Sequence, residues 1–288
     1  MVNLSSLKGA NHPMATTHND TPHSQAAAPA FTSSIYGPVR SWRVGLSLGV
    51  DLLLDTSICS FNCVYCQLGD IQLKTAERKV YVPTAKVAQD LAQSPWQQAD
   101  VVTFSGNGEP TLALNLGECL QLVKTTTGKP TMVLTNATLL NDPAVQADLA
   151  HADHVACKLD AATDTVLQRM NRPVAGITMA SIVQGIQAFK ATYTGKLSLQ
   201  CMFMPTNFDE VDALAELVGS LAPHEVQLNT PKRPYPLSWV VDSRGNHGDP
   251  IVDSRTLRTL SEPQADEIEA RLRAALGDIT ILSIYKRS

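Results

Sequence analysis

From about residue 44, short apolar runs alternate with stretches in which apolar residues recur at helical spacing. Strands are predicted at residues 48–55, 101–106, 131–136, 154–160, 197–205 and 226–231. Helices are predicted between and after them at residues 84–94, 113–126, 142–150, 164–170, 178–192 and 209–221. Ser261 followed by Gln264 forms a capping box before a last helix, about 262–276. This alternation favours a parallel sheet with helical crossovers.

Several of these strands have one apolar face and one polar face. In HVACKLD (154–160), every second residue is apolar, and His154, Lys158 and Asp160 share the opposite face. The runs containing Gln200 and Asn229 alternate in the same way. A parallel sheet buried on both sides would read as continuous apolar runs, so a polar face indicates strands that curl around a cavity. Six strands are fewer than the eight of a full barrel, and we expect a partial (β/α)6 barrel with outer helices.

The N-terminal segment differs in composition from the rest of the chain. It is rich in Ser, Thr, Ala, His and Pro, and it has neither the apolar run nor the arginine-rich pattern of a targeting peptide. We therefore expect a disordered tail over residues 1–33. A partial-barrel domain is expected over residues 34–245, followed by a C-terminal extension, 246–288, that contains the last helix.

The charge balance restricts the possible partners. The chain has 23 Lys and Arg against 27 Asp and Glu, and its net charge is -4. No apolar run is long enough to span a bilayer, so we expect a cytoplasmic protein without a membrane partner. Nucleic-acid enzymes usually have a basic surface, so a nucleic acid is a possible but not a favoured partner. A small-molecule or peptide substrate is favoured instead.

Three of the six cysteines form a cluster, Cys59, Cys63 and Cys66, with the spacing C-x3-C-x2-C. The other three, Cys119, Cys157 and Cys201, are isolated in apolar segments, where a cysteine is usually a small buried hydrophobe. Three thiolates can hold three irons of a 4Fe–4S cluster and leave the fourth iron open. The alternatives are a structural zinc site, which needs four ligands, or three inert thiols.

The polar motifs follow successive strands. The cysteine loop comes after the first predicted strand, and GNGEP (106–110) comes after the second. Asn136 ends the third predicted strand, and Asp160 ends the fourth. Active sites of α/β barrels lie at the carboxyl ends of the strands, so these motifs are expected to meet at one rim.

The motif C-x3-C-x-aromatic-C, with Tyr65 before the last cysteine, resembles the signature of the radical S-adenosylmethionine (SAM) superfamily. The resemblance implies that Cys59, Cys63 and Cys66 hold a 4Fe–4S cluster whose open iron binds SAM. It also implies that the reduced cluster cleaves SAM to a 5'-deoxyadenosyl radical, which takes a hydrogen atom from the substrate. An electron donor such as flavodoxin or ferredoxin is then expected as a partner.

The same resemblance implies further cofactor contacts. SGNGEP (105–110) is similar to the glycine-rich motif that holds the methionyl amino group of SAM in this superfamily. LTNATLL resembles its TNG segment, with Ala137 in place of glycine. The expected cofactor-binding residues are Tyr65, Gly106, Asn107, Gly108, Glu109, Asn136, Gln200 and Asn229. A Gly108→Val variant is therefore expected to lose SAM cleavage and keep the cluster.

The segments YGPVRSWRVGLSLGVD, CSFNCVYCQLG, SGNGEPTL and QLNTP resemble a narrower group, the single-cluster Fe–S oxidoreductases related to tRNA 4-demethylwyosine synthase. That synthase has a second cluster held by upstream cysteines, and this chain has no cysteine before Cys59. Lys158 and Asp160 are candidate catalytic residues, with Lys158 binding a carboxylate of substrate or cofactor. The alternative is a structural ion pair across the rim.

Three other functions are compatible with the sequence. They are a tRNA base-modifying enzyme of the wyosine type, a glycyl-radical enzyme activase, and a non-catalytic Fe–S protein. The acidic balance and the absence of upstream cysteines oppose the first. A non-catalytic carrier would need neither the GNGEP loop nor a polar lumen. We therefore favour a radical SAM enzyme of the oxidoreductase or lyase type.

Overall fold

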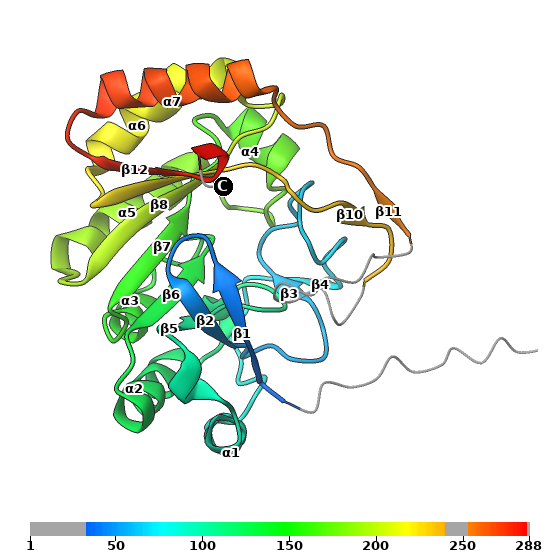
Figure 1. The fold of residues 1–288 in the computed structure, drawn as a ribbon, viewed down its shortest axis with the longest axis vertical. Helices are drawn as coiled ribbons and strands as arrows, with labels where there is room; N and C mark the ends of the chain where they lie inside the picture. The colour runs from blue at the N-terminus through cyan, green and yellow to red at the C-terminus, as the bar shows by residue number, and fades with distance from the viewer. Residues whose placement is uncertain (1–32, 240–252, 287–288) are drawn as a thin grey trace, which may run out of the picture.

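The computed structural model describes residues 33–239 and 253–286. Its main sheet has eight strands in the order β1-β2-β5-β6-β7-β8-β9-β12. They are β1 (Ile35–Ser41), β2 (Gly45–Val50), β5 (Val101–Phe104), β6 (Thr131–Thr135), β7 (His154–Lys158), β8 (Lys196–Met202), β9 (Glu225–Asn229) and β12 (Thr280–Ser283). From β2 to β12 all neighbouring strands are parallel, and β1 pairs antiparallel with β2. The sheet curls into part of a barrel (Figure 1), as predicted.

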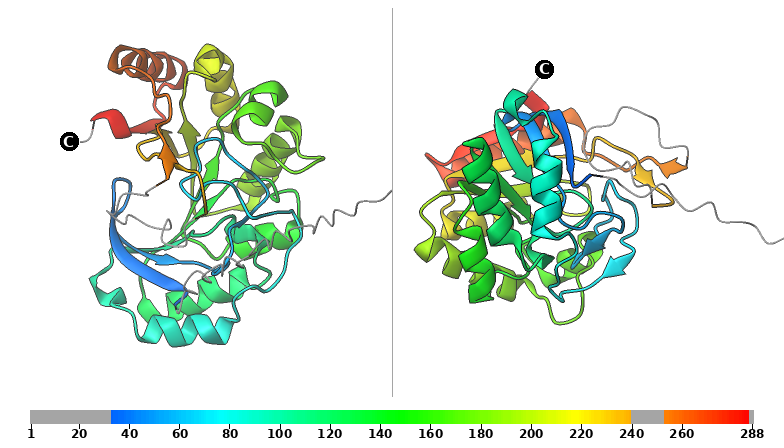
Figure 2. Two further views of the ribbon diagram at one scale, coloured as in Figure 1. Left: turned by 90° about the vertical axis from the view of Figure 1, so that its right-hand side faces the viewer. Right: turned by 90° about the horizontal axis from the view of Figure 1, so that it is seen from below.

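The helices lie on the outer side of this sheet (Figure 2). They are α1 (Thr84–Ala92), α2 (Leu116–Thr127), α3 (Pro143–Leu149), α4 (Asp164–Met170), α5 (Met179–Thr192), α6 (Val211–Leu221) and α7 (Glu262–Leu276). Each corresponds to a helix predicted from the sequence. The capping box before α7 is present, since the Ser261 backbone N–H donates to Gln264 Oε1 at 3.0 Å.

The main sheet has two strands in addition to the six that were predicted. β12 follows α7 and pairs with β9, from Thr280 opposite Glu225 to Ser283 opposite Leu228, so the C-terminal segment continues the sheet. β1 forms a hairpin with β2 at the other edge. The first predicted strand, 48–55, is also displaced, because β2 ends at Val50 and the Asp51 carboxylate accepts the Leu53 N–H at 2.9 Å in a turn. The expected tail, 1–33, lies outside the described residues except for its last residue, and so does the expected boundary at residue 245.

The alternation of apolar and polar positions correctly predicts the two faces of the sheet. Val155, Cys157, Leu197 and Leu199 are fully buried in the core between the sheet and the helices. Of the residues that alternate with them, Ala156, Lys158 and Gln200 line the cavity of the lumen, whereas Ser198 is fully buried. Cys119, Cys157 and Cys201 also belong to this core, which confirms the prediction that they are buried hydrophobes.

Short elements cover the carboxyl end of the barrel. They are β3 (Ile58–Cys59), β4 (Leu73–Lys74), β10 (Tyr235–Pro236), β11 (Ser254–Arg255) and the 3-10 turns η2 (Pro110–Leu112), η3 (Phe208–Glu210) and η5 (Ile284–Lys286). A further 3-10 turn, η1 (Trp96–Gln98), lies at the opposite end, just before β5. The segment after β9 contacts the cysteine loop, since Arg233 donates to Gln67 Oε1 at 3.0 Å and Tyr235 Oη donates to Asp70 at 2.7 Å. Two segments far apart in the sequence therefore form this end of the barrel together.

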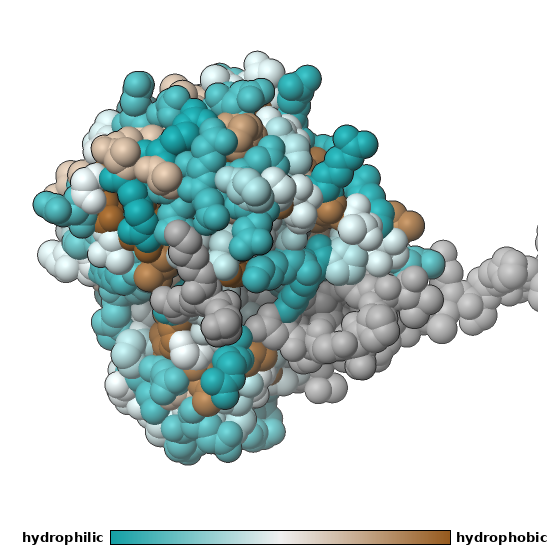
Figure 3. Space-filling model, turned by 45° about the horizontal axis from the view of Figure 1, so that its top comes forward, coloured by the Kyte–Doolittle hydropathy of each residue, from teal (hydrophilic) through white to brown (hydrophobic). Residues whose placement is uncertain are grey.

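Within the described residues, no helix has the length and apolar character needed to cross a membrane. On the face that carries α6 and α7, the surface is mainly hydrophilic, and hydrophobic residues form small separate patches (Figure 3). Patches of this kind are normal on a protein surface and do not by themselves indicate an interface.

Candidate active site

The lumen of the curled sheet contains a cavity of about 530 Å³. The cysteine loop, the β1–β2 hairpin and the carboxyl ends of β5 to β9 contribute to its wall. The predicted site residues that line it are Cys59, Cys63, Tyr65, Cys66, Gly108, Glu109, Asn136, Lys158, Gln200 and Asn229. Gly106, Asn107 and Asp160 are not in its wall. The expectation that the motifs meet at one end of the barrel is therefore met for most of them.

The cysteine loop is held on two sides by backbone hydrogen bonds. On one side, Ile58 N–H donates to Asn107 O at 2.8 Å, and Glu109 N–H donates to Ile58 O at 2.9 Å. On the other side, Asn62 N–H donates to the carbonyl of Asn171 at 2.8 Å, at the end of α4. The loop is thus fixed between the GNGEP segment and α4.

Close backbone packing explains the glycines of the GNGEP segment. Gly108 has φ +149°, and a Cβ at this position would lie 1.6 Å from Ile58 O. A Cβ on Gly106, at φ +140°, would lie 2.4 Å from Asp51 Cγ. Asn107 is buried, and its side chain donates to Leu54 O. Gly106 and Asn107 therefore pack against the protein behind the cavity wall. Of the four residues of this segment predicted to contact the cofactor, Gly108 and Glu109 line the cavity.

The Glu109 carboxylate ties the GNGEP segment to the end of β6. It accepts hydrogen bonds from Thr111 Oγ1 and Thr135 Oγ1, both at 2.7 Å, and from Asn136 N–H at 2.6 Å. Burial raises the pKa of the Glu109 carboxyl, while these hydrogen bonds act in the opposite direction. Asn136 in turn donates to Ser60 Oγ at 2.8 Å and to Cys59 Sγ at 3.5 Å. The end of β6 is thereby connected to the first cysteine.

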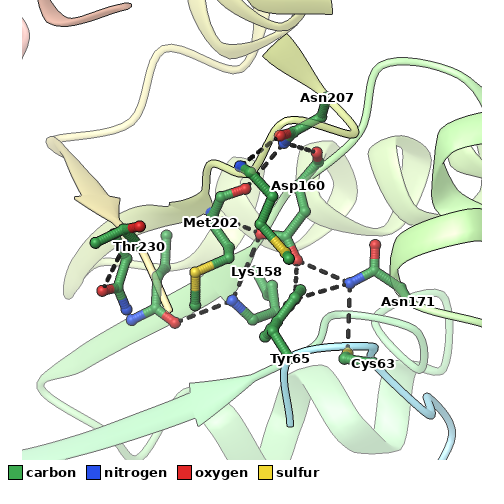
Figure 4. A network of polar contacts seen from close by, with 11 residues as sticks. Cys63, Tyr65, Lys158, Asp160, Asn171, Met202, Asn207 and Thr230 are labelled. Carbon is green, nitrogen blue, oxygen red and sulfur yellow. Dashed lines mark hydrogen bonds and ion pairs between the residues drawn. The ribbon is translucent and has the colours of Figure 1, made fainter. Parts of the chain in front are cut away.

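Asp160 is the centre of a buried polar network (Figure 4). Its carboxylate accepts hydrogen bonds from Tyr65 Oη, from Asn171 Nδ2 at 2.7 Å and from Met202 N–H at 2.8 Å. Lys158 Nζ lies 3.5 Å from the same carboxylate. The Asp160 side chain is fully buried and outside the cavity wall, and its contacts anchor Tyr65, Asn171 and Lys158 to the end of β8.

Lys158 differs from Asp160 because it reaches the cavity. Its side chain is 17% exposed, and its Nζ lies 3.3 Å from Gln200 Oε1 and 5.2 Å from the centre of the Tyr65 ring. Tyr65 and Asp160 therefore hold the ammonium group in place while it faces the lumen.

One residue of the site, Asn171, was not identified from the sequence. Asn171, at the end of α4, donates to Tyr65 Oη at 3.0 Å and to Cys63 Sγ at 3.4 Å. Nothing in its sequence context distinguishes it from an ordinary helix C-terminal residue. Arg43, on the turn between β1 and β2, also lines the cavity. The sequence indicates Arg43, together with Arg40, as a candidate for binding an anionic substrate, because both precede the first predicted strand.

The three clustered thiols lie in a buried environment. Burial raises the pKa of Cys59, Cys63 and Cys66, and that of Cys66 to about 12. A bound metal stabilises the thiolate and reverses this effect. Within residues 33–239 and 253–286, no three or more His, Cys, Asp or Glu side chains come close enough to hold a single metal ion. The three cysteines are supported as cluster ligands by their spacing and their common loop.

Asp160→Asn should destabilise the protein, because it removes a fully buried carboxylate and leaves the partly buried Lys158 charge without its partner. The expected loss in free energy of unfolding is about 3–5 kcal/mol. The control is Asp212→Asn, since the Asp212 carboxylate pairs with Arg271 at 2.7 Å but is 74% exposed, and its loss should be small. Anaerobic denaturant titration compares the two variants. Equal losses would show that Asp160 is not the anchor of the network.

Comparison with known proteins agrees with this geometry. The profile of the Radical SAM superfamily matches residues 53–218. The chain is 48% identical over 255 residues to the UPF0026 protein slr1464 of Synechocystis sp., and the match covers 84% of this chain and 96% of that protein.

Among solved structures, Streptococcus suis SuiB bound to S-adenosylmethionine has a TM-score of 0.58 at 11% identity, over 83% of this chain and 50% of SuiB. SuiB bound to its precursor peptide SuiA has a TM-score of 0.51 at 15% identity, over 65% of this chain and 39% of that chain. This chain thus spans half of SuiB or less, and the likeness shows the fold alone.

These comparisons confirm the recognition made from the cysteine loop and the predicted partial barrel. A 4Fe–4S cluster and SAM are the cofactors that characterise the superfamily, as predicted. The narrower link to 4-demethylwyosine synthase stays a prediction. By its sequence profile, its fold and its similarity to slr1464, the chain belongs to the Radical SAM superfamily and, within it, to the UPF0026 proteins.

Proposed function

We propose that this protein reductively cleaves SAM at a 4Fe–4S cluster held by Cys59, Cys63 and Cys66. The products are methionine and a 5'-deoxyadenosyl radical, which takes a hydrogen atom from a small-molecule or peptide substrate. The observation that carries the proposal is that the three cysteines share one loop, which borders the barrel cavity in a chain of the Radical SAM superfamily.

The cavity and its wall fit these cofactors. Its volume of about 530 Å³ lies within the usual range of small-molecule sites. Gly108 brings the backbone into the wall beside the cysteine loop, where a side chain would not fit. When bound, a reduced cluster supplies the electron that breaks the sulfonium bond of SAM. The thiols of Cys59, Cys63 and Cys66 would hold three of its irons and leave the fourth iron for SAM.

Polar residues of the wall have suitable chemistry for binding SAM. The Lys158 ammonium can pair with the SAM carboxylate, and the amide side chains of Asn136 and Asn229 can bind its ribose and adenine. Gln200 Nε2 is buried and has no hydrogen-bond partner among the described residues, so its N–H groups are available to a ligand. These four groups lie at or just after the carboxyl halves of β6, β7, β8 and β9, so together they would hold SAM in a fixed position relative to the cysteine loop.

Apolar residues between these polar groups would limit water at the reacting centre. Phe61, Met132, Leu134 and Ala156 line the same cavity. None of these four side chains carries a charge or a hydrogen-bond donor that would hold water in this part of the cavity. This lining suits chemistry by a carbon radical, which must meet its substrate before other partners.

The substrate class, the electron donor and the reaction type are part of the proposal. The peptide bound to SuiB supports a peptide as one candidate substrate. Flavodoxin or ferredoxin would supply the electron, and the reaction would be of the oxidoreductase or lyase type. A cytoplasmic location would suit the free thiols. The wyosine-type enzyme and the glycyl-radical activase remain alternatives.

The test of the proposed function is cofactor loading and cleavage under anaerobic conditions. After reconstitution with iron and sulfide, we expect about four iron atoms per chain. Reduction with dithionite in the presence of SAM should yield 5'-deoxyadenosine and methionine in equal amounts, and a sample without dithionite should yield neither. A cluster that forms without any reductive cleavage would favour the non-catalytic Fe–S alternative and contradict the proposal.

A further inference from the structure

Arg43 occupies an unusual place for an arginine. It lies on the turn between β1 and β2, is partly buried and lines the cavity. Its guanidinium carbon lies 4.6 Å from the centre of the Trp42 ring. Its Nε is buried and has no hydrogen-bond partner among the described residues. A buried donor without a partner is costly, so this N–H is expected to have an acceptor that belongs to a ligand.

The charges of the cavity wall favour an anion. Four cationic side chains line it, those of Arg43, Lys158, Lys232 and Arg233. Among the described residues, the wall contains a single carboxylate, that of Glu109, which already accepts hydrogen bonds from the protein. The cavity therefore has an excess of positive charge, although the chain as a whole is acidic.

The carboxylate of Glu225 lies close enough to influence the charge of Arg43, but it accepts no hydrogen bond from Arg43 Nε. Glu225, the first residue of β9, stabilises the charged guanidinium electrostatically. Its carboxylate is bound by Lys196 Nζ at 2.8 Å and by Gln227 Nε2 at 2.9 Å. Burial lowers the pKa of Arg43 to about 10, so the group remains charged at neutral pH.

Topology separates Arg43 from the cofactor end of the barrel. β2 begins directly after the turn that contains Arg43, and the cysteine loop follows the carboxyl end of the same strand. Arg43 therefore lies toward the amino end of the parallel strands, and Cys59, Cys63 and Cys66 lie at the other end. The cavity extends from one to the other. A molecule held by Arg43 would reach from there toward the site proposed for SAM.

We infer that Arg43 anchors an anionic group of the substrate, a carboxylate or a phosphate, in the inner part of the lumen. The inference rests on the proposed function, which it extends by naming the substrate class. A guanidinium offers several N–H donors in a plane that matches both anions. The substrate is thus a small acid or phosphate ester, or a peptide that presents an acidic side chain.

The test uses inorganic phosphate and malonate as probes of the reconstituted protein, with and without SAM, at constant ionic strength. Isothermal titration should detect binding of at least one probe, and SAM should not displace it. Arg43→Met should weaken that binding by at least about tenfold. Arg40→Met is the matched control, because Arg40 lies on the same hairpin but is exposed and outside the cavity wall. The Arg40→Met variant should bind the probe with the same affinity as the unmodified protein.

Arg43→Lys provides a second variant that keeps the charge but loses the planar arrangement of donors, and its affinity should be intermediate. Absence of binding by the unmodified protein, equal binding by Arg43→Met, or displacement of the probe by SAM would each overturn the inference. The proposed function is judged separately by SAM cleavage in the unmodified protein. If cleavage is absent but binding depends on Arg43, the anion site stands and the radical chemistry does not.

Discussion

Replacing Cys59, Cys63 or Cys66 individually by alanine should abolish cluster assembly, from about four iron atoms per chain to fewer than about one. Each thiolate would hold a different iron, so two remaining ligands cannot keep the cluster. Formation of 5'-deoxyadenosine should fall below detection in all three variants. Iron and sulfide analysis, the visible absorption of the cluster and chromatography of the products measure this result.

The chain offers its own controls, because its other three cysteines are buried in the core. Cys119→Ala, Cys157→Ala and Cys201→Ala remove thiols that are at most 1% exposed and are not part of the cavity wall. Each variant should be somewhat less stable, because the missing thiol leaves a small void in the core, but it should bind the full amount of iron. If iron binding required one of these three cysteines, the cluster would not have an open iron and the proposed chemistry would fail.

Gly108→Ala should destabilise the protein severely, by roughly 2–6 kcal/mol. Its Cβ would lie 1.6 Å from a backbone oxygen, that of Ile58, and φ is +149°. Because Ile58 directly precedes Cys59, the displaced backbone should also disturb the cysteine loop. We therefore expect reduced iron incorporation as well, in contrast to the expectation from the sequence that a Gly108 variant would lose only SAM cleavage.

Gly128→Ala is the matched control for strain without crowding. Gly128 has φ +63°, and a Cβ there would meet no atom within 4 Å. Its substitution should cost only about 1–2 kcal/mol and leave iron incorporation unchanged. Denaturant titration and iron analysis compare the two variants. A Gly108→Ala protein as stable as Gly128→Ala would show that the loop can move away from Ile58, and that crowding does not fix the cysteine loop.

Asp160 and Arg43 illustrate why a sequence pattern identifies a face but not a role. Alternation correctly placed Lys158 toward the lumen. It also assigned Asp160 to that face, although β7 ends at Lys158 and the chain turns before Asp160. Beyond the end of a strand the period of two no longer applies, so the carboxylate could turn inward to Tyr65 and Met202. Arg43 lines the cavity because it lies on the turn of the antiparallel β1–β2 hairpin, which was not predicted from the sequence.

The sequence by itself determined the periodic and local features of this protein. Seven helices, six parallel strands, the polar lumen and the cysteine spacing follow from short-range patterns of side chains. The tertiary structure decided the features that depend on distant partners. β12 is four residues long and exists because it pairs with β9, and Asn171 contacts Cys63 across 108 positions. Backbone contact with Ile58 likewise gives Gly108 its structural role. Such contacts leave no periodic signal, because they form only when the sheet has closed around the lumen.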